Sequence, residues 1–209
     1  MTKILCFTVR FMQPYCHARG ERDEPEWPPS PLRLFQALVA AAAGRWNERT
    51  EVASAKDALR WLEQQEAPLI LAPRGTPARA TYRLYVPDNV GDKVAASWCR
   101  DKTGAIADYR TEMAKAKNLV EKDVRSTCLQ GEAVHYLYSI NQGDGQFPSY
   151  RETLVAAARS MTHLGWGIDM VVGNATVLSP EEVEKLPGER WQETKGYSGP
   201  RKLDHSVSY

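Results

Sequence analysis

A short polar stretch near the start of the chain contains a histidine and two arginines. His17, Arg19 and Arg22 lie within residues 15–22, after a strand-like segment and before a proline-rich one. Guanidinium groups bind phosphate in a planar fork, so this composition is typical of a loop that holds an anionic ligand. The alternative is a polar loop whose charges are neutralised by nearby acids, which are Glu21, Asp23, Glu24 and Glu26. The residues alone leave both interpretations open.

The other histidines are weaker candidates for chemistry. A general base must reach the proton that it abstracts, whereas His135 shares a strand face with Leu137, and we expect a structural role for it. His163 is expected at a helix end, where it would interact with the carbonyl dipole, and His205 lies in a terminal tail. No side chain is therefore assigned as catalytic, and His17 and His135 remain the alternatives.

No motif predicts a metal or a cofactor. The glycines Gly165, Gly167 and Gly173 do not form the dinucleotide-binding pattern, and Walker, HExxH and paired-carboxylate motifs are absent from the sequence. The four cysteines, Cys6, Cys16, Cys99 and Cys128, lack metal-binding spacing. We expect them to be reduced thiols of a cytoplasmic protein.

The composition is that of a water-soluble globular chain. Among 209 residues, 43% are hydrophobic and 25% are charged, and the net charge is only +1. This balance argues against a generic polybasic nucleic-acid binder, so RNA binding would need local basic patches. The sequence contains no secretory signal and no apolar run long enough to span a membrane, so no membrane partner is expected.

The elements that must position the first loop have clear sequence signals. Residues 3–11 alternate between apolar and polar types, which predicts a strand with one apolar face. Pro28 and Pro29 keep the approach extended, and Ser30 with Pro31 forms a helix start. Apolar side chains then recur at helical spacing and predict the buried stripe of this helix: Leu32, Phe35, Leu38, Val39 and Ala42.

Later segments alternate between helical and strand-like patterns. Capping-box patterns predict helices that begin at Ser54, Ser149 and Ser179. Strands are expected at 69–72, 81–87, 133–140 and 168–178. Residues 88–130 form an insertion with a helix over 105–125, and residues 187–209 lack core residues.

The resulting order approximates βαββαβ and predicts an α+β, ferredoxin-like (RRM-like) core. We expect one domain over 1–180, which includes the insertion, and a short helix with a tail or docking segment over 181–209. The predicted buried core comprises Leu5, Phe7, Val9, Leu34 or Phe35, Leu38, Leu154, Ala158 and Met161.

Four stretches together resemble a known family. They are the E-P-E-W-P-P-S-P-L-R-L segment at 24–34 and the segments at 68–73, 82–89 and 134–138. The chain resembles the first, handle-binding (Cas-five-like) half of the fused handle-binding and repeat-processing subunit of type I-G (formerly I-U) CRISPR effector complexes. That subunit belongs to the RAMP superfamily of CRISPR RNA-binding proteins.

The resemblance implies an RNA-binding subunit of a Cascade-like ribonucleoprotein in antiviral defence. Its implied role is to hold the 5′ handle of the CRISPR RNA beside the backbone and large subunits, with target DNA contacted only indirectly. Cleavage activity is expected in a second half that is not part of this sequence, and a separate repeat-processing half is among the partners that the resemblance implies. Two alternatives stay open: a metal-independent RAMP endoribonuclease that uses His17 or His135, and an interaction protein without an RNA role.

The expected RNA contacts come from the first loop and from the insertion. For the helix over 105–125, the resemblance implies an RNA-contacting thumb, and the alternative is a solvated helix with many ion pairs. The full set of predicted RNA-binding residues is Arg10, His17, Arg19, Arg22, Trp27, Arg33, Arg110, Lys115, Lys117, Lys122 and Arg125.

Overall fold

The computed structural model describes residues 3–20, 24–45, 49–87, 119–141 and 143–192, without the side chains of 49–52 and 87. The chain divides into two compact units. Residues 1–78 and 126–209 form the first unit, and residues 79–125 form the second. Each unit is described below by itself.

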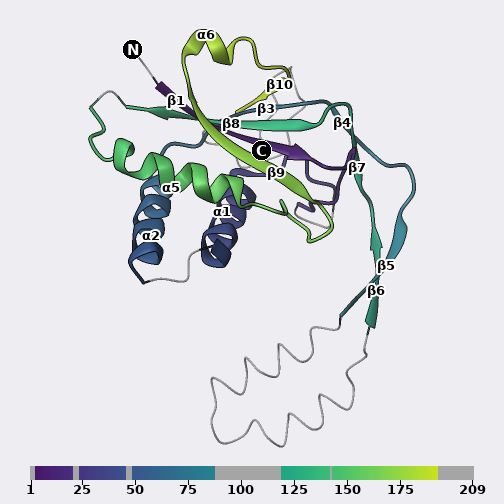
Figure 1. The fold of residues 1–209 in the computed structure, drawn as a ribbon. Coiled ribbons are helices and arrows are strands. Elements are labelled where there is room, and N and C mark those ends of the chain that lie inside the picture. The colour runs from purple at the N-terminus through teal and green to yellow at the C-terminus, as the bar shows by residue number, and fades with distance from the viewer. Residues whose placement is uncertain (1–2, 21–23, 46–48, 88–118, 142, 193–209) are drawn as a thin grey trace, which may run out of the picture. The chain divides into compact units, whose positions relative to one another are not determined.

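A five-stranded antiparallel sheet organises the first unit (Figure 1). Its strands are ordered β10-β3-β8-β1-β9. The bounds are Lys3–Phe11 for β1, Leu69–Ala72 for β3, Ala133–Ile140 for β8, Val171–Leu178 for β9 and Glu189–Trp191 for β10. The register places Thr8 of β1 between His135 of β8 and Asn174 of β9.

Three helices cover one face of this sheet (Figure 1): α1 (Pro31–Arg45), α2 (Arg49–Glu63) and α5 (Phe147–Arg159). Alternate residues of β1 and β8 point toward these helices and are buried, as the strand patterns predict. The expected core members Leu5, Phe7, Val9, Leu34, Leu38, Leu154, Ala158 and Met161 are all buried in one cluster.

The opposite face of the sheet is covered in part by a short helix, α6 (Pro180–Val183). Val183 packs there against Cys6, Leu71 and Leu137. The helix starts with a capping box in which the Ser179 side chain accepts from Glu182 N–H and the Glu182 carboxylate accepts from Ser179 N–H. The predicted helix start at Ser179 is confirmed.

A three-stranded sheet of the same unit lies next to the first loop. Its order is β2-β7-β4, with β2 at Tyr15–Cys16, β4 at Gly75–Pro77 and β7 at Thr127–Leu129. The Trp27 ring packs on Gly75 so closely that a Cβ at this glycine would overlap the indole. The sequence analysis did not predict this small sheet.

The second unit contains a two-stranded antiparallel ribbon, β5 (Tyr82–Pro87) and β6 (Leu119–Val124). The strand expected at 81–87 is thus present, but the helix expected over 105–125 is wrong at its C-terminal end. Residues 119–124 pair in register with β5, with Lys122 opposite Leu84. Cross-strand pairing overrides the helix propensity of this segment.

The stripe expected to be buried on α1 is wrong in part. Leu32 is 63% exposed and Val39 is 41% exposed, whereas the buried residues of α1 are Leu34, Leu38 and Ala42. The exposed and the buried residues are all apolar and recur at helical spacing, so the sequence pattern does not distinguish them. Contacts with the sheet and with α5 decide which of these residues are buried.

Two helix starts and one terminal segment also differ from expectation. Helix α2 begins at Arg49, five residues before Ser54, because a Ser-x-x-Asp pattern does not stop a helix from extending upstream. Helix α5 begins at Phe147, where the Asp144 carboxylate accepts from the N–H groups of Gln146 and Phe147. The tail expected to lack core residues contains β10, whose Trp191 packs against the core.

The outer edge of β9 is crossed by an arginine. Gly173 faces α5, since a Cβ there would overlap the Ala158 carbonyl, so the neighbouring Asn174 points to the opposite face of the sheet. Arg159, the last residue of α5, donates from Nε to Asn174 Oδ1 at 2.9 Å. Because β9 is the edge strand, the Arg159 side chain reaches Asn174 around that edge.

Within the described ranges, no helix is long and apolar enough to cross a membrane.

We predict that Leu38→Ala lowers the free energy of unfolding by about 2–5 kcal/mol, because it leaves a cavity at a fully buried site. Chemical denaturation followed by circular dichroism measures this change. The matched control is Leu32→Ala on the same helix, which is exposed and should change stability by no more than about 0.5 kcal/mol. Equal losses for the two variants would contradict this assignment of the α1 faces.

Candidate nucleic-acid interface

The first loop folds back on itself as a narrow antiparallel turn. Gly20 N–H donates to Glu24 O, and Glu26 N–H donates to Ala18 O, both at 2.9 Å. Arg19 and Pro25 form an isolated β-bridge within this turn. Arg22 lies outside the described residues.

His17 anchors this loop to a second one that follows α5. Asp169 accepts from the His17 backbone N–H at 2.8 Å, and its other oxygen lies 2.5 Å from His17 Nδ1. Both residues are buried, with 7% of His17 and 3% of Asp169 exposed. Burial raises the pKa of the Asp169 carboxyl, although the hydrogen bonds from His17 oppose this shift.

The same two loops bring an arginine and a tryptophan together. The Arg19 guanidinium lies over the Trp166 ring, 5.2 Å from its centroid, and both side chains are half-buried. Gly165, which precedes the tryptophan, has φ +94° and abuts Ala18 and Arg33 of the first segment. The backbone conformation of Gly165 is one that side chains rarely adopt, so this close approach depends on glycine. We refer to His17, Arg19, Arg33, Trp166 and Asp169 as the two-loop site.

Arg33 is held inside this arrangement by a carboxylate. It pairs with Glu26 at 2.9 Å and also donates to the Arg19 carbonyl. The other oxygen of Glu26 accepts from Ser30 N–H at 2.8 Å, at the start of α1. Of the acids expected to neutralise the loop, Glu26 therefore pairs with Arg33.

Trp27 and Tyr136 attach the proline-rich segment to the sheet. Trp27 Nε1 donates to Pro73 O at 2.8 Å, and its ring packs on Phe11 with centroids 5.8 Å apart. The buried Tyr136 hydroxyl donates to Pro29 O at 2.7 Å. These contacts hold the entry to α1 in place and give Trp27 a packing role.

Cys16 and His135 are poorly suited to covalent or acid–base chemistry. Burial, with the nearby Asp169 charge, raises the pKa of Cys16 to about 12, so its thiol stays protonated. His135 lies on the sheet face away from the large helices, where its Nδ1 is 2.9 Å from Thr8 Oγ1. Burial and the Arg10 charge lower the pKa of His135, so its imidazole is neutral near pH 7.

The remaining predicted RNA contacts are not members of the two-loop site. Arg10 is exposed on β1 and pairs with Glu132. Lys122 and Arg125 belong to the second unit, where Lys122 is exposed on β6 and the neighbouring Arg83 pairs with Glu121 at 2.5 Å. Arg110, Lys115 and Lys117 lie outside the described residues, as does most of the proposed thumb segment.

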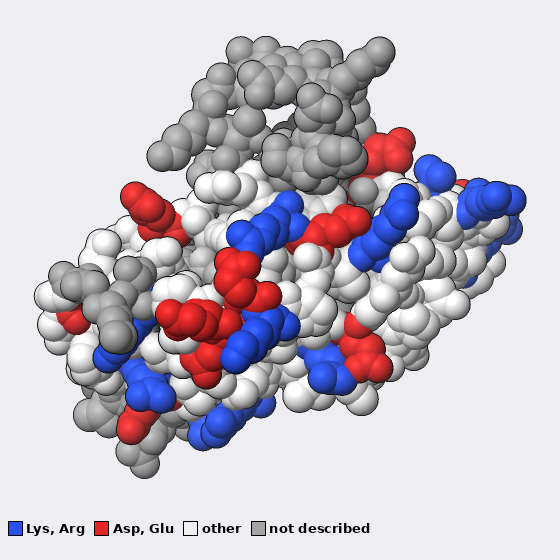
Figure 2. Space-filling view, turned by 90° about the horizontal axis from the view of Figure 1, so that it is seen from above, with Lys and Arg blue, Asp and Glu red and all other residues white. Residues whose placement is uncertain are grey.

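The charges on one face of the molecule are mixed in sign. Figure 2 shows one face of the molecule, on which basic and acidic side chains alternate without a broad patch of one sign. Among the described residues, no group of three or more His, Cys, Asp or Glu side chains is arranged to hold a metal ion.

The sequence analysis missed Trp166 and Asp169. Gly165 and Gly167, on either side of Trp166, do not form the dinucleotide-binding pattern, and the sequence predicts no other role for them. The one available signal was the composition of G-W-G-x-D, in which two glycines allow a tight loop beside an aromatic and an acid. The pairing with residues 17 and 19 depends on the tertiary fold.

Comparison with known proteins identifies the family. Residues 9–203 match the model of the CRISPR-associated protein, GSU0054 family. The chain belongs to this family. Membership of this family indicates a role in CRISPR defence, which is the general part of what the resemblance implied.

Among solved structures, the chain is similar to one described as the crystal structure of a CRISPR protein from Archaeoglobus fulgidus. The TM-score is 0.43 at 10% sequence identity, and the match covers 86% of this chain and 65% of that one. The present chain thus spans less than two thirds of the length of the matched protein. No curated protein matches the sequence.

We predict that Asp169→Ala lowers the free energy of unfolding by about 3–5 kcal/mol, because it leaves the buried His17 without its carboxylate. Urea denaturation measures the loss. Glu132→Ala is the control, since it removes an exposed ion-pair partner and should cost no more than about 1 kcal/mol. A loss for Asp169→Ala as small as that of the control would contradict the anchoring role.

We also predict that His135 makes stability fall on acidification. Its pKa is lowered in the folded state from 6.5, so the unfolded chain binds the proton first. Stability should therefore decline as pH falls from about 6.5 toward the folded-state pKa. His135→Gln should decline less over this window when both proteins are denatured in urea at several pH values. Parallel pH profiles would show that His135 is not responsible.

Proposed function

We propose that this member of the GSU0054 family binds CRISPR RNA as a subunit of a type I effector complex. It would hold the 5′ handle at the two-loop site beside the backbone and large subunits. The observation that carries the proposal is the Arg19–Trp166 pair, held at the surface by a buried contact between two loops. An arginine stacked on an aromatic ring offers a phosphate ligand and a base-stacking surface together.

The sheet topology supports the ferredoxin-like assignment within this proposal. The four strands β3-β8-β1-β9 are all antiparallel to their neighbours. Helix α1 lies between β1 and β3 in the sequence, and α5 lies between β8 and β9. This is the βαββαβ order that RRM-like and RAMP proteins share, and we extend the assignment to type I-G and to the handle-binding half on the sequence resemblance.

The preorganisation of the site favours binding over cleavage. The side chains of His17 and Arg33 are engaged by Asp169 and Glu26, so they hold the loops rather than face a ligand. Phosphate and base contacts would then fall to Arg19 and Trp166, with Arg22 and the basic residues of the second unit as further contributors. Specificity would come from unstacked bases of a single strand.

A second candidate function is metal-independent cleavage of repeat RNA by His17. The observation in its favour is the carboxylate beside His17 Nδ1, because such a pair can orient an imidazole for proton transfer. The burial of His17 argues for a structural tie instead. Repeat RNA that is cut by the wild type, and left intact by a folded His17→Gln variant, would favour this second function.

We predict that Trp166→Leu weakens binding of repeat-derived RNA by about 1–3 kcal/mol, the usual contribution of one stacked base. Arg19→Gln should weaken binding and reduce the salt slope by roughly 0.7 for one lost phosphate contact. Fluorescence anisotropy over a salt series measures both effects. Co-purification with the neighbouring subunits, followed by sequencing of the bound RNA, identifies the strand.

The matched control is Arg190→Gln. Arg190 is an exposed arginine of β10, the edge strand opposite β9, and it pairs with Glu184. The affinity and salt slope of this variant should equal those of the wild type. If Arg19→Gln and Trp166→Leu behave like this control, RNA binding at the two-loop site is wrong.

A further inference from the structure

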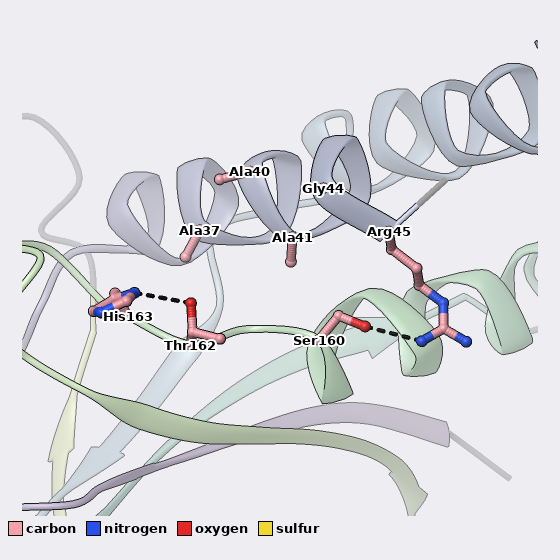
Figure 3. A pocket seen from close by; sticks show the side chains of 8 residues that line it. All are labelled: Ala37, Ala40, Ala41, Gly44, Arg45, Ser160, Thr162 and His163. Carbon is pink, nitrogen blue, oxygen red and sulfur yellow. Dashed lines mark hydrogen bonds between the residues drawn. The ribbon is translucent and has the colours of Figure 1, made fainter. Parts of the chain in front are cut away.

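A groove runs between α1 and the segment that follows α5 (Figure 3). It has a volume of about 480 Å³, and Ala37, Ala40, Ala41 and Gly44 form its α1 wall. The opposite wall carries Ser160, Thr162 and His163, and Arg45 stands at the far end. None of the described residues that line the groove is acidic.

The groove begins where the two-loop site ends. Arg33, Ala37, Ala41 and Arg45 follow one another at four-residue spacing, so they form a stripe that winds gradually around α1. At the other wall, His163 precedes Gly165 by two residues, and Gly165 abuts Arg33. The stripe from Arg33 to Arg45 is ~18 Å long.

The polar side chains of the groove are hydrogen-bonded, and the Ser160 hydroxyl donates to Ala156 O at 2.9 Å. Arg45 Nη1 donates to Ser160 Oγ at 3.0 Å, and Thr162 Oγ1 lies 2.8 Å from His163 Nδ1. The contact between Arg45 and Ser160 is exposed, so an incoming phosphate can reach the guanidinium. The small side chains of the α1 wall leave room for a sugar or a base to lie against the helix.

Arg45 also offsets an unfavourable field. Helices α1 and α5 both end beside this groove, and their terminal carbonyl groups repel anions. Each helix has an arginine in its last turn, Arg45 in α1 and Arg159 in α5. Arg45 therefore makes the Ser160 end of the groove more favourable for an anion than the helix ends alone would be.

We propose that this groove is a second RNA-binding site, which guides a single strand from the two-loop site along α1 to Arg45. The inference rests on the proposed function, because the strand enters from the two-loop site. Arg45 would bind a phosphate, the hydroxyls of Ser160 and Thr162 would bind ribose hydroxyls, and the alanine wall would contact sugar or base.

The test uses labelled oligouridylates of about four and about twelve nucleotides, which bracket a short single-strand site. Fluorescence anisotropy gives the affinity of the full chain and of its variants. Arg45→Gln should weaken the longer RNA about tenfold, as expected for a lost charged hydrogen bond, and leave the shorter RNA unaffected. Ala41→Leu should do the same by filling the groove, and Arg45→Lys should recover most of the affinity.

Two controls separate the groove from general charge and size effects. Arg60→Gln removes a positive charge from the exposed surface of α2, and Ala43→Leu enlarges an exposed side chain on the α2 side of α1. Neither should alter RNA affinity. Thermal melting confirms that each variant is folded.

The outcomes distinguish this proposal from the function on which it rests. If Arg19→Gln weakens both RNAs while Arg45→Gln and Ala41→Leu weaken neither, the two-loop site stands and the groove proposal is overturned, with the groove left to a protein partner. If the groove variants weaken the longer RNA while Arg19→Gln has no effect, RNA does not enter from the two-loop site, and the continuous path is wrong. A wild type that binds neither RNA rejects both.

Discussion

The buried contact between His17 and Asp169 joins two loops that lie 152 residues apart in the sequence. Asp169 accepts from both the backbone and the ring of His17, so position and orientation are set together. The stacking of Arg19 on Trp166 and the approach of Gly165 to Arg33 both require these loops to be in contact. A surface pair with little stabilisation of its own is therefore maintained by a contact that solvent does not reach.

The two-loop site separates the residues that hold it from those that face outward. Arg33 and Trp27 are committed to internal partners, Glu26 and the Pro73 carbonyl. The Trp27 ring also requires the missing side chain of Gly75. Rigid loops reduce the ordering cost when a ligand binds, so under the proposed function the packing of these residues would raise RNA affinity without contacting the RNA.

The sequence predicted β1 and β8 well because burial on one face of a strand depends on alternation alone. Leu5, Phe7 and Val9 illustrate this, and His135 falls on the other face as its position indicates. The buried face of α1 could not be predicted in full, because two faces of this helix are apolar and only tertiary contacts decide between them. Asp169 and Trp166 could not be assigned, since nothing near them in the sequence shows which distant loop they meet.

Helix α5 contributes to more than the core, because its last residue, Arg159, crosses the outer edge of β9 to reach Asn174. Strand β9 has eight residues and none of them is charged, and such an edge is a template for pairing with another chain. The charge that interrupts this edge comes from α5, and so it is in place only after the helix has docked. If β9 pairs with the sheet before α5 docks during folding, its edge is therefore uncharged and open to pairing with another chain, which is an aggregation-prone state.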